Sequence, residues 1–412
     1  MKKNLLVIGT TWPEPQATAA GGRMERLMAF FTDEGYQITF ASTANESSLS
    51  MDLQLLGIQK KSIVLNHSSF DDFLSALQPN IVLFDRFPME EQFGWRVAEF
   101  APGALRILDT EDLHSLRKTR ETALKDNITW NRDYWLQADI TKREIASIYR
   151  CDLSLIISDF EMDLLQNTLC LDDSLLFHLP FMVGPLDDKV VAEWPAFEQR
   201  TDFVFIGTGK HAPNKDAVQW LKKEIWPLIR EELPTANCSI YGSYLPEAIT
   251  QLHRPKEGFY IEGEAQNVVA LMQSKRINLA PLRFGAGIKG KLMTGMLCGT
   301  PSITTLIGVE GMRGNLAWNG RIAATAEEFA AAAVALYGNP NEWEAAQNNG
   351  KILINTLFDA QALKRKLALK LEKLVVDIPA HRRQNFIGGL LQHQTMSSTM
   401  YMSKWITEKN RK

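Results

Sequence analysis

A glycine-rich stretch with three basic side chains carries the most informative chemistry of this 412-residue sequence. It runs from Pro281 to Met312 and places Arg283, Lys289 and Lys291 among glycines, where an apolar run with helical spacing begins. A helix N-terminus carries unpaired N–H groups and a partial positive charge, so cations beside it favour a bound phosphate. The stretch therefore predicts an anion site, and an ordinary strand–turn–helix unit with solvated lysines is the alternative.

A second basic turn lies earlier in the same half of the chain. An apolar run ends at Gly207, and Lys210 and His211 follow it before the next run with helical spacing. Asn214 is well suited to cap that helix. Two such turns at the carboxyl ends of strands would suit a diphosphate.

Polar residues also follow two predicted strands of the N-terminal half. Asp85 ends one apolar run, and Asp112 and His114 stand in an acidic cluster after another. One histidine among acidic residues gives too few ligands for zinc, so we predict no metal site. The cluster either lines a ligand cleft or caps the following helix. That helix continues into a basic, tryptophan-containing segment, which either contacts an acidic ligand or membrane or is simply solvated.

Short apolar runs alternate with helical patterns along most of the chain, which predicts parallel sheets covered by helices. The fold class is therefore α/β, with two doubly wound domains. The expected strands are 5–9, 36–42, 62–65, 81–85, 105–109 and 153–158 in the first domain and 203–207, 238–242, 259–263, 277–282, 302–305 and 321–325 in the second. The predicted ranges are an N-terminal domain over 1–183, a linker over 184–200, a C-terminal domain over 201–381 and a helical tail over 382–412.

Composition excludes several classes of protein. The net charge of -3 argues against a nucleic-acid binder, and the hydrophobic share of 45% is ordinary for a globular protein. The four cysteines have no paired spacing, which disfavours a disulfide framework and favours a reducing compartment. The N-terminal apolar run is too short for a signal peptide, and no run approaches the roughly 20 apolar residues of a membrane span. We expect a cytoplasmic protein.

Two segments resemble GT-B glycosyltransferases of the retaining family-four group (glycosyl transferases group 1). They are PLRFGAGIKGKLMTGMLCGTP with TTLIGVEGM, and FVFIGTGKHAPNKDAV with WLKKEIWPLI. The resemblance is strongest from Asp202 to Met312. It implies two Rossmann-like domains facing across a cleft, with the acceptor in the first, the sugar donor in the second and a last helix that crosses back to the first.

The resemblance also implies roles for individual residues. The donor would be a nucleoside-diphosphate sugar, used with retention and without a cofactor or metal. The predicted catalytic residues are Arg283, Lys291 and His114. The predicted donor-binding residues are Gly207, Lys210, Asn214, Gly285, Gly287, Lys289, Thr294 and Glu310. The predicted acceptor or phosphate loop contains Gly21, Gly22, Asp85 and Asp112.

One departure from the family pattern leaves the function open. Family members carry two glutamates spaced E-x7-E, and the matching positions here are Ala286 and Thr294. Glu310 is the nearest acidic residue in the next loop. We expect a glycosyltransferase acting on a glycan or glycolipid acceptor, with peripheral membrane contact at the inner face as an option. A catalytically silent nucleotide-sugar-binding relative is the alternative, and a nonhydrolysing epimerase is a weaker one.

Overall fold

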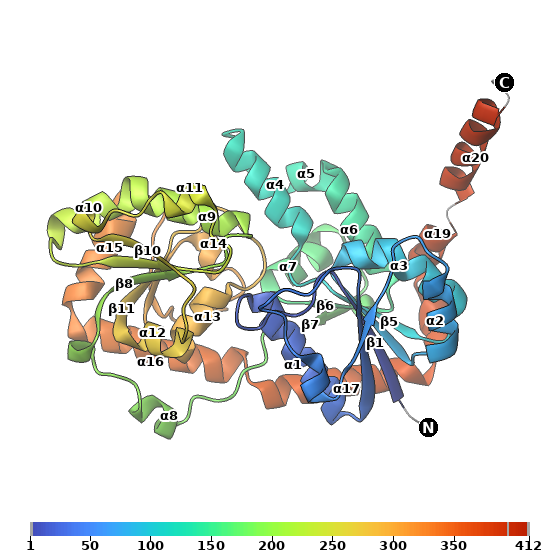
Figure 1. The fold of residues 1–412 in the computed structure, drawn as a ribbon, viewed down its shortest axis with the longest axis horizontal. Coiled ribbons are helices and arrows are strands. Elements are labelled where there is room, and N and C mark those ends of the chain that lie inside the picture. The colour runs from blue at the N-terminus through green and yellow to red at the C-terminus, as the bar shows by residue number, and fades with distance from the viewer. Residues whose placement is uncertain (1–2, 394, 410–412) are drawn as a thin grey trace.

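Two parallel β-sheets, each in its own lobe, organise the protein (Figure 1). The computed structural model describes residues 3–393 and 395–409. The first sheet has the strand order β3-β2-β1-β4-β5-β6-β7, and every neighbouring pair is parallel. Its strands are β1 (Lys3–Gly9), β2 (Tyr36–Ser42), β3 (Gln59–Ser62), β4 (Ile81–Asp85), β5 (Leu105–Asp109), β6 (Leu153–Ile156) and β7 (Leu176–His178).

The second sheet has the strand order β10-β9-β8-β11-β12-β13, again parallel throughout. Its strands are β8 (Thr201–Ile206), β9 (Cys238–Tyr241), β10 (Phe259–Gly263), β11 (Lys275–Ala280), β12 (Ser302–Thr304) and β13 (Gly320–Ile322). In both sheets the strand order reverses beside the first strand, which is the doubly wound pattern. The predicted α/β class with two doubly wound domains is confirmed.

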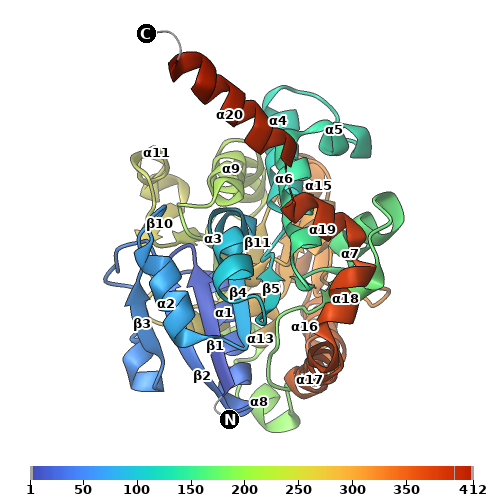
Figure 2. The ribbon, with the colours of Figure 1, turned by 90° about the vertical axis from the view of Figure 1, so that its right-hand side faces the viewer.

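The helices pack on both faces of the sheets, as the two perpendicular views show (Figures 1 and 2). In the N-terminal lobe they are α1 (Ala19–Asp33), α2 (Ser69–Leu77), α3 (Phe87–Phe100), α4 (His114–Lys125), α5 (Arg132–Gln137), α6 (Asp139–Arg150) and α7 (Asp159–Asp163). The remaining helices are α8 (Asp188–Ala192), α9 (Ala212–Trp220), α10 (Trp226–Glu232), α11 (Glu247–Thr250), α12 (Val268–Ser274), α13 (Gly290–Leu297), α14 (Leu306–Val309), α15 (Ala326–Gly338), α16 (Pro340–Leu357), α17 (Ala360–Val376), α18 (Ile378–Gln384), α19 (Phe386–Gln392) and α20 (Thr395–Lys409).

Each buried strand contributes side chains to two separate apolar cores, one on each face of its sheet. In β1, Leu5 and Val7 join one apolar cluster, whereas Leu6 and Ile8 join the cluster on the opposite face. Successive side chains of a strand point to opposite faces, so a strand covered on both sides must be apolar throughout. This requirement explains why the strands read as continuous apolar runs.

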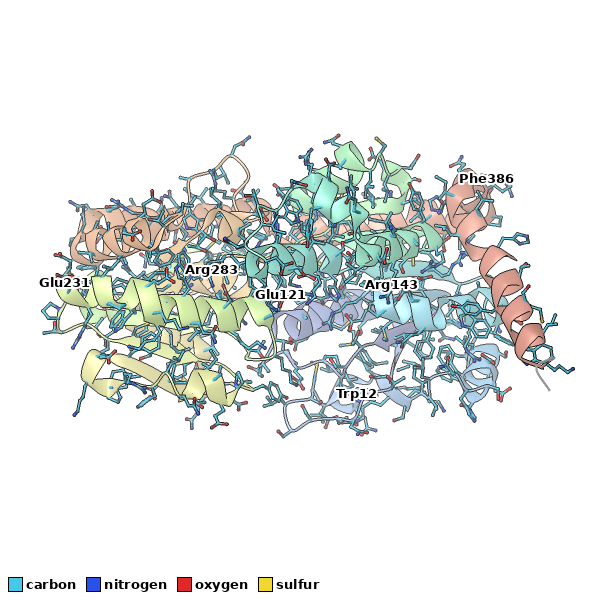
Figure 3. The ribbon with its side chains drawn as sticks, turned by 90° about the horizontal axis from the view of Figure 1, so that it is seen from above. Trp12, Glu121, Arg143, Glu231, Arg283 and Phe386 are labelled. Atoms are coloured by element: carbon cyan, nitrogen blue, oxygen red, sulfur yellow. The ribbon has the colours of Figure 1, made fainter. Side chains whose placement is uncertain are left out.

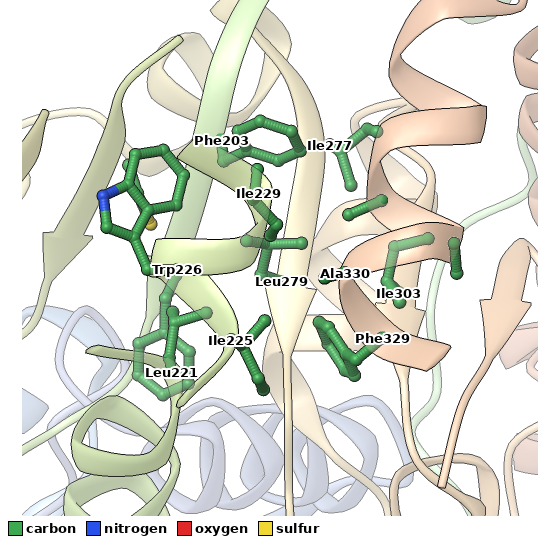
Figure 4. Packing of buried hydrophobic residues seen from close by; sticks show 14 of the residues in the cluster. Phe203, Leu221, Ile225, Trp226, Ile229, Ile277, Leu279, Ile303, Phe329 and Ala330 are labelled. Atoms are coloured by element: carbon green, nitrogen blue, oxygen red, sulfur yellow. The ribbon is translucent and has the colours of Figure 1, made fainter. Parts of the chain in front are cut away.

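Aromatic side chains fill the core of the C-terminal lobe. Phe203, Trp226 and Phe329 pack with aliphatic side chains of neighbouring strands and helices, among them Leu279 of β11 and Ile229 of α10 (Figure 4). Trp226 is 1% exposed, and its indole N–H donates to the Glu257 carbonyl at 2.7 Å. Its polar atom is therefore satisfied inside an apolar cluster.

The N-terminal lobe differs from the sequence prediction at its third strand, its first helix and its last strand. The third strand is Gln59–Ser62 instead of 62–65, because β3 is an edge strand that pairs only with β2 and need not be apolar. Helix α1 begins at Ala19, since the Thr18 side chain accepts a hydrogen bond from the Gly21 N–H and caps the helix there. Gly21 and Gly22 therefore lie in the first turn of α1 and not in a turn before it. The seventh strand, β7, was not among the predicted strands.

The chain returns to the N-terminal lobe through α17, which lies beneath that lobe, after α16 has passed beneath the C-terminal lobe (Figure 1). Leu363, Leu367 and Leu371 of this helix belong to the core under the first sheet. The chain therefore crosses back to the N-terminal lobe at α17, before residue 382, where the sequence predicts the returning tail to start. Farther on, Arg382 donates to both Asp152 carboxylate oxygens, at 2.8 and 2.7 Å. Residues 394 and 410–412 of the predicted tail lie outside the described residues. Within the described ranges, no helix combines the length and apolarity that a membrane crossing requires.

A buried ion pair joins α1 to the end of β5. The Arg23 Nη2 lies 2.8 Å from the Asp109 Oδ1, and the two side chains are 2% and 0% exposed. The Arg23 Nη1 also donates to the Leu179 carbonyl at 2.7 Å. Burial lowers the pKa of Arg23, but Asp109 outweighs this effect and raises it overall. The guanidinium therefore stays charged and fixes the helix over the sheet edge.

Removing one partner of this pair should destabilise the N-terminal lobe. We expect Arg23→Leu to lower the free energy of unfolding by about 3–5 kcal/mol, because Asp109 would remain buried without its cation. Arg143→Leu is the control, since Arg143 pairs with Glu91 at the surface, and it should cost about 1 kcal/mol or less. Urea unfolding followed by circular dichroism measures both, and equal effects of the two substitutions would contradict this account.

Candidate active site

A cavity of about 690 Å³ lies between the two lobes, where the carboxyl ends of both sheets meet. Thr11 after β1 and Asp85 at the end of β4 line it from the N-terminal side. Gly207 after β8 and Leu282 after β11 line it from the C-terminal side. Parallel α/β sheets bind ligands at such switch points, so this cavity is the candidate site.

Two lysines stand at the start of α13 on the C-terminal wall. Lys289 is 7% exposed and its Nζ donates to the Gly287 carbonyl at 2.7 Å. The Lys291 Nζ donates to the Asn214 Oδ1, also at 2.7 Å. Burial lowers the pKa of Lys289 to about 8, and burial together with Lys289 lowers that of Lys291 to about 7. An anion placed here would restore the charge of both groups.

The second basic turn faces the same space. Gly207, Lys210, His211 and Asn214 all line the cavity, and the Lys210 ammonium lies 3.3 Å from the centre of the Tyr244 ring. Asn214 does not cap α9, because the helix already begins at Ala212. Its amide N–H instead donates to the Thr208 carbonyl at 3.0 Å, and its amide oxygen accepts the hydrogen bond from the Lys291 ammonium. Asn214 therefore links the two basic turns.

Arg283 does not line the cavity, contrary to its predicted catalytic position. Its Nε donates to the Asp216 Oδ2 at 2.9 Å, and the guanidinium lies 5.5 Å from the Trp220 ring centre. Leu282 and Phe284, its neighbours in sequence, do line the cavity. Asp216 on α9 neutralises Arg283 outside the site, a pairing that spacing along the chain could not reveal.

Glu310 likewise stays away from the cavity lining, because it binds the other lobe. Arg120 of α4 donates to both Glu310 oxygens, at 2.6 and 2.9 Å, and to the Gly285 carbonyl at 2.8 Å. The Arg120 guanidinium also lies 4.9 Å from the Trp130 ring centre. This contact joins α4 of the N-terminal lobe to the glycine-rich turn.

A buried glutamate makes a second link to the same turn. The Glu161 Oε1 accepts hydrogen bonds from the Gly287 N–H at 2.9 Å and from the Leu113 N–H at 2.8 Å. Burial and the nearby Asp112 raise the pKa of Glu161 to about 7. Gly287 has a φ of 61° and an added Cβ would lie 2.8 Å from Asp112, so this position requires glycine. Gly287 is thus an interdomain contact and not part of the cavity lining.

The N-terminal wall holds the other predicted residues. Gly21, Gly22, Asp85, Asp112 and His114 all line the cavity. The His114 Nε2 lies 3.3 Å from the Asp112 Oδ1, and burial lowers the pKa of His114 to about 4. Burial would raise the pKa of Asp112, but Arg117 and His114 outweigh it and keep that pKa well below its usual range. At neutral pH, His114 is therefore uncharged beside an ionised Asp112.

The basic, aromatic segment after His114 is not a free surface. Trp135 is fully buried, Arg117 pairs with Asp112 at 2.7 Å, and Arg120 pairs with Glu310. Internal partners therefore engage Trp135 and Arg120, whereas Arg117 also lines the cavity and can face a ligand there. Among the described residues, no group of three or more histidine, cysteine or acidic side chains could hold a metal ion.

The two positions that lack the family glutamates do reach the cavity. Ala286 and Thr294 both line it together with Gly285, and the Thr294 hydroxyl donates to the Gly290 carbonyl at 2.9 Å. Other lining residues were not among the predicted site residues, although His211 lies in the predicted second basic turn; they are Arg86, Glu111, Arg117, His211 and Glu264. Glu111 and Glu264 follow the ends of β5 and β10, so the rule that selected Asp85 could also have selected them.

Comparisons with known proteins agree with this architecture. Residues 200–339 match the family model "Glycosyl transferases group 1". The sucrose-phosphate synthase structure from Thermosynechococcus elongatus is 13% identical with a TM-score of 0.66, covering 91% of this chain and 100% of its own. Anabaena HepE with UDP-glucose is 10% identical with a TM-score of 0.65, covering 90% and 100%. WaaG, a glycosyltransferase of lipopolysaccharide biosynthesis, is 13% identical with a TM-score of 0.61, covering 88% and 98%. No curated protein sequence matches.

These findings confirm the predicted GT-B fold and the resemblance to group 1 glycosyltransferases. The family match covers the domain that holds Lys289 and Lys291, and it confirms the enzyme class as glycosyltransferase. The roles predicted for individual residues stay predictions.

The two lysines make anion binding dependent on pH. Between pH 6.5 and 8.5 the free protein loses charge at Lys291 and then at Lys289, whereas a bound diphosphate would hold both protons. We expect the affinity for UDP-glucose, whose phosphates do not titrate in this range, to fall by about a hundredfold over this interval, because both lysines must regain a proton on binding. Calorimetry should show proton uptake on binding. Lys291→Arg keeps its charge over this range, so this variant should show a weaker dependence of affinity on pH. An affinity of the wild type that does not change with pH would contradict the assignment of the two lysines to the anion site.

Proposed function

We propose that the protein transfers a sugar from a nucleoside-diphosphate sugar to a hydroxyl group of a glycan or glycolipid, with retention of configuration. The donor would bind the C-terminal wall of the cavity and the acceptor the N-terminal wall. Metal-independent catalysis is part of the proposal, with the protein's own cations as the groups that stabilise the diphosphate. HepE, a neighbour in fold, was solved with UDP-glucose, which supports this donor class.

The observation that carries the proposal is that Lys291, a partly buried cation on the cavity wall, has no anionic partner in the described part of the chain. Among the described residues, no carboxylate forms an ion pair with Lys291, and its Nζ contacts the neutral Asn214 oxygen. Lys289, which lies close in sequence, lowers the pKa of Lys291 further. A lysine whose pKa falls for these reasons favours an anionic ligand, and α13 begins beside it with its partial positive charge.

The chemistry that follows needs no nucleophile from the protein. The bond between the anomeric carbon and the diphosphate oxygen breaks, and its electron pair stays on the diphosphate. The acceptor oxygen bonds to the same face of that carbon, and its proton passes to the departing diphosphate oxygen. Negative charge grows on the diphosphate as the bond breaks, so Lys289 and Lys291 would stabilise the transition state more than the ground state.

A catalytically silent nucleotide-sugar-binding relative is the second candidate. It is favoured by Ala286 and Thr294, which line the cavity without carboxylates, and by Glu310, which Arg120 engages. Glu264 at the rim of the C-terminal wall is a carboxylate that could hold ribose hydroxyls in their place. Binding of nucleotide sugars without turnover would favour this candidate.

We also propose a cytoplasmic location with peripheral contact at the inner membrane face, made by the end of the chain. Phe386 of α19 is 70% exposed, and Leu390 and Trp405 are 56% and 58% exposed. From Ile378 on, the sequence has six lysines and arginines against one glutamate. Helix α20 points away from the body of the N-terminal lobe (Figures 1 and 2). Exposed aromatic residues with nearby cations suit an anionic lipid surface.

The donor site is tested by Lys291→Met. Purified protein is incubated with UDP-, GDP-, dTDP- and ADP-sugars, and release of the nucleoside diphosphate is measured with a mixture of acceptor glycans. We expect one sugar nucleotide to be turned over and Lys291→Met to reduce the rate about a hundredfold, since one charge contact to the leaving group is lost.

Lys223→Met is the matched control, because Lys223 is exposed on the C-terminal lobe and does not line the cavity. It should leave the rate unchanged. Equal rates for Lys291→Met and the wild type would remove Lys291 from the site, and absence of nucleotide binding in the wild type would refute the proposed function.

The membrane contact is tested by sedimentation with vesicles. The wild type should bind vesicles that contain phosphatidylglycerol and not vesicles of phosphatidylcholine alone. A Phe386→Ser, Leu390→Ser double variant should bind at least about fivefold less, since two exposed apolar contacts are lost. Leu55→Ser, at an 84% exposed leucine of the N-terminal lobe, is the control. Unchanged binding of the double variant would contradict this assignment.

A further inference from the structure

Acidic side chains gather at one end of the cavity, on the N-terminal wall. Asp85 ends β4, Asp109 ends the neighbouring β5, and Glu111 follows two residues later. Asp85 and Glu111 line the cavity, and Asp85 is only 5% exposed. The opposite wall carries Lys289 and Lys291, so the two walls differ in the sign of their charge.

The cations near these carboxyl groups are fewer than the carboxyl groups themselves. Arg23 is engaged by Asp109, which it contacts through Nε and Nη2 at 2.8–3.1 Å. Arg86 is left for the other two, and its Nε lies 3.4 Å from the Asp85 Oδ1. Farther along this wall, Arg117 is paired with Asp112 at 2.7 Å. Two arginines therefore face three carboxyl groups at this end of the cavity.

Two buried carboxyl oxygens at this end have no hydrogen-bond partner. The Asp85 Oδ2 accepts from the Thr10 N–H at 3.1 Å, but its Oδ1 accepts no hydrogen bond. The Glu111 Oε1 is also buried and without a hydrogen-bond partner. A buried acceptor without a hydrogen bond costs free energy. The Asp85 Oδ1 has only the ion pair with Arg86 at 3.4 Å, so both atoms favour a hydrogen-bond donor from within the cavity.

The backbone holds both carboxyl groups in place. Glu111 has a φ of 62°, and Arg86, directly after Asp85, has a φ of 73° and a ψ of 157°. Such conformations cost about 1–3 kcal/mol for a residue with a side chain and persist only where surrounding structure imposes them. The Glu111 carbonyl oxygen would lie 3.4 Å from a Cβ at Gly287, so this end of the wall meets the glycine-rich turn of the other lobe.

The electrostatics agree with the geometry. Burial raises the pKa of Glu111 to about 8, with Asp109 adding to the shift and Arg86 and Arg23 opposing it. Burial and Asp109 also raise the pKa of Asp85. At neutral pH the pair holds a proton, so it offers both a donor and acceptors, which suits a hydroxyl group and disfavours an anion.

We propose that Asp85 and Glu111 determine acceptor specificity by hydrogen-bonding adjacent hydroxyl groups of an uncharged sugar ring. This assignment rests on the proposed function and narrows its acceptor to a neutral saccharide unit at the reacting end. A phosphorylated or carboxylated ring would bring its negative charge against the two carboxyl groups. The unpaired oxygens of Asp85 and Glu111 would receive the sugar hydroxyls, while the lysines of the opposite wall keep the diphosphate.

Saturation-transfer NMR on the full chain with saturating UDP tests this proposal. The probes are methyl α-glucoside, methyl β-galactoside and methyl α-mannoside, each compared with its 6-phosphate. We expect at least one neutral glycoside to bind at least about tenfold more tightly than its phosphate. Glu111→Ala should weaken that glycoside about tenfold, and Glu111→Gln and Asp85→Asn should weaken it less, because an amide still hydrogen-bonds a hydroxyl.

The affinity for UDP is measured in parallel and should stay within about twofold of the wild type in every variant. Glu121→Gln is the matched control, since Glu121 pairs with Lys118 and Lys125 on the outer side of α4 and does not line the cavity (Figure 3). This control should bind the glycoside as the wild type does.

Several results would overturn the proposal. They are tighter binding of the phosphates, an unchanged glycoside affinity in Glu111→Ala, or no binding of any neutral glycoside while UDP still binds. Loss of UDP binding in the wild type is a different outcome, because it would refute the proposed function itself. The preference for a neutral glycoside over its 6-phosphate is measured on the wild type alone. The proposal can therefore be tested even if a variant fails to fold.

Discussion

The site depends on the hydrogen bonds and the ion pair that join the N-terminal lobe to the glycine-rich turn. Arg120 binds the Gly285 carbonyl and the Glu310 carboxylate, and Glu161 binds the Gly287 N–H. These contacts are short and largely buried, and Arg120 and Glu310 form a two-point ion pair, so the contacts are stronger than surface ion pairs. They hold the glycine-rich turn before α13 against the segments that follow β5 and β6, and the cavity lies beside this contact.

Charge is distributed unevenly across that space. On the C-terminal wall, burial lowers the pKa of Lys289 and Lys291, and an anion would restore their charge. On the N-terminal wall, burial raises the pKa of Asp85 and Glu111, and an uncharged hydroxyl suits them. The same physical cause, desolvation, thus acts in opposite directions on the two sides. A substrate with a charged end and a neutral end would fit only one way round.

The two positions that carry glutamates in the family lie at the cavity in this protein, but their side chains are not acidic. Ala286 and Thr294 lie on the cavity wall, so the positions are where the family pattern requires them, but the carboxylates are absent. Glu310 does not replace them, because its ion pair with Arg120 serves the contact between lobes. Glu264 follows the end of β10 and also lines the cavity, so a carboxylate from another strand reaches the C-terminal wall.

The sequence alone determined the two doubly wound sheets, the basic turns at Lys210 and Lys289, and the acidic strand end at Asp85. Strand runs and turns depend on near neighbours, and parallel strands carry their carboxyl ends to one edge whatever the loops do. Only the tertiary structure decided which charges are free. Arg283 meets Asp216 from 67 residues away, and Arg120 meets Glu310 from 190 residues away. Such pairings depend on how the elements pack in space, and no local pattern records them.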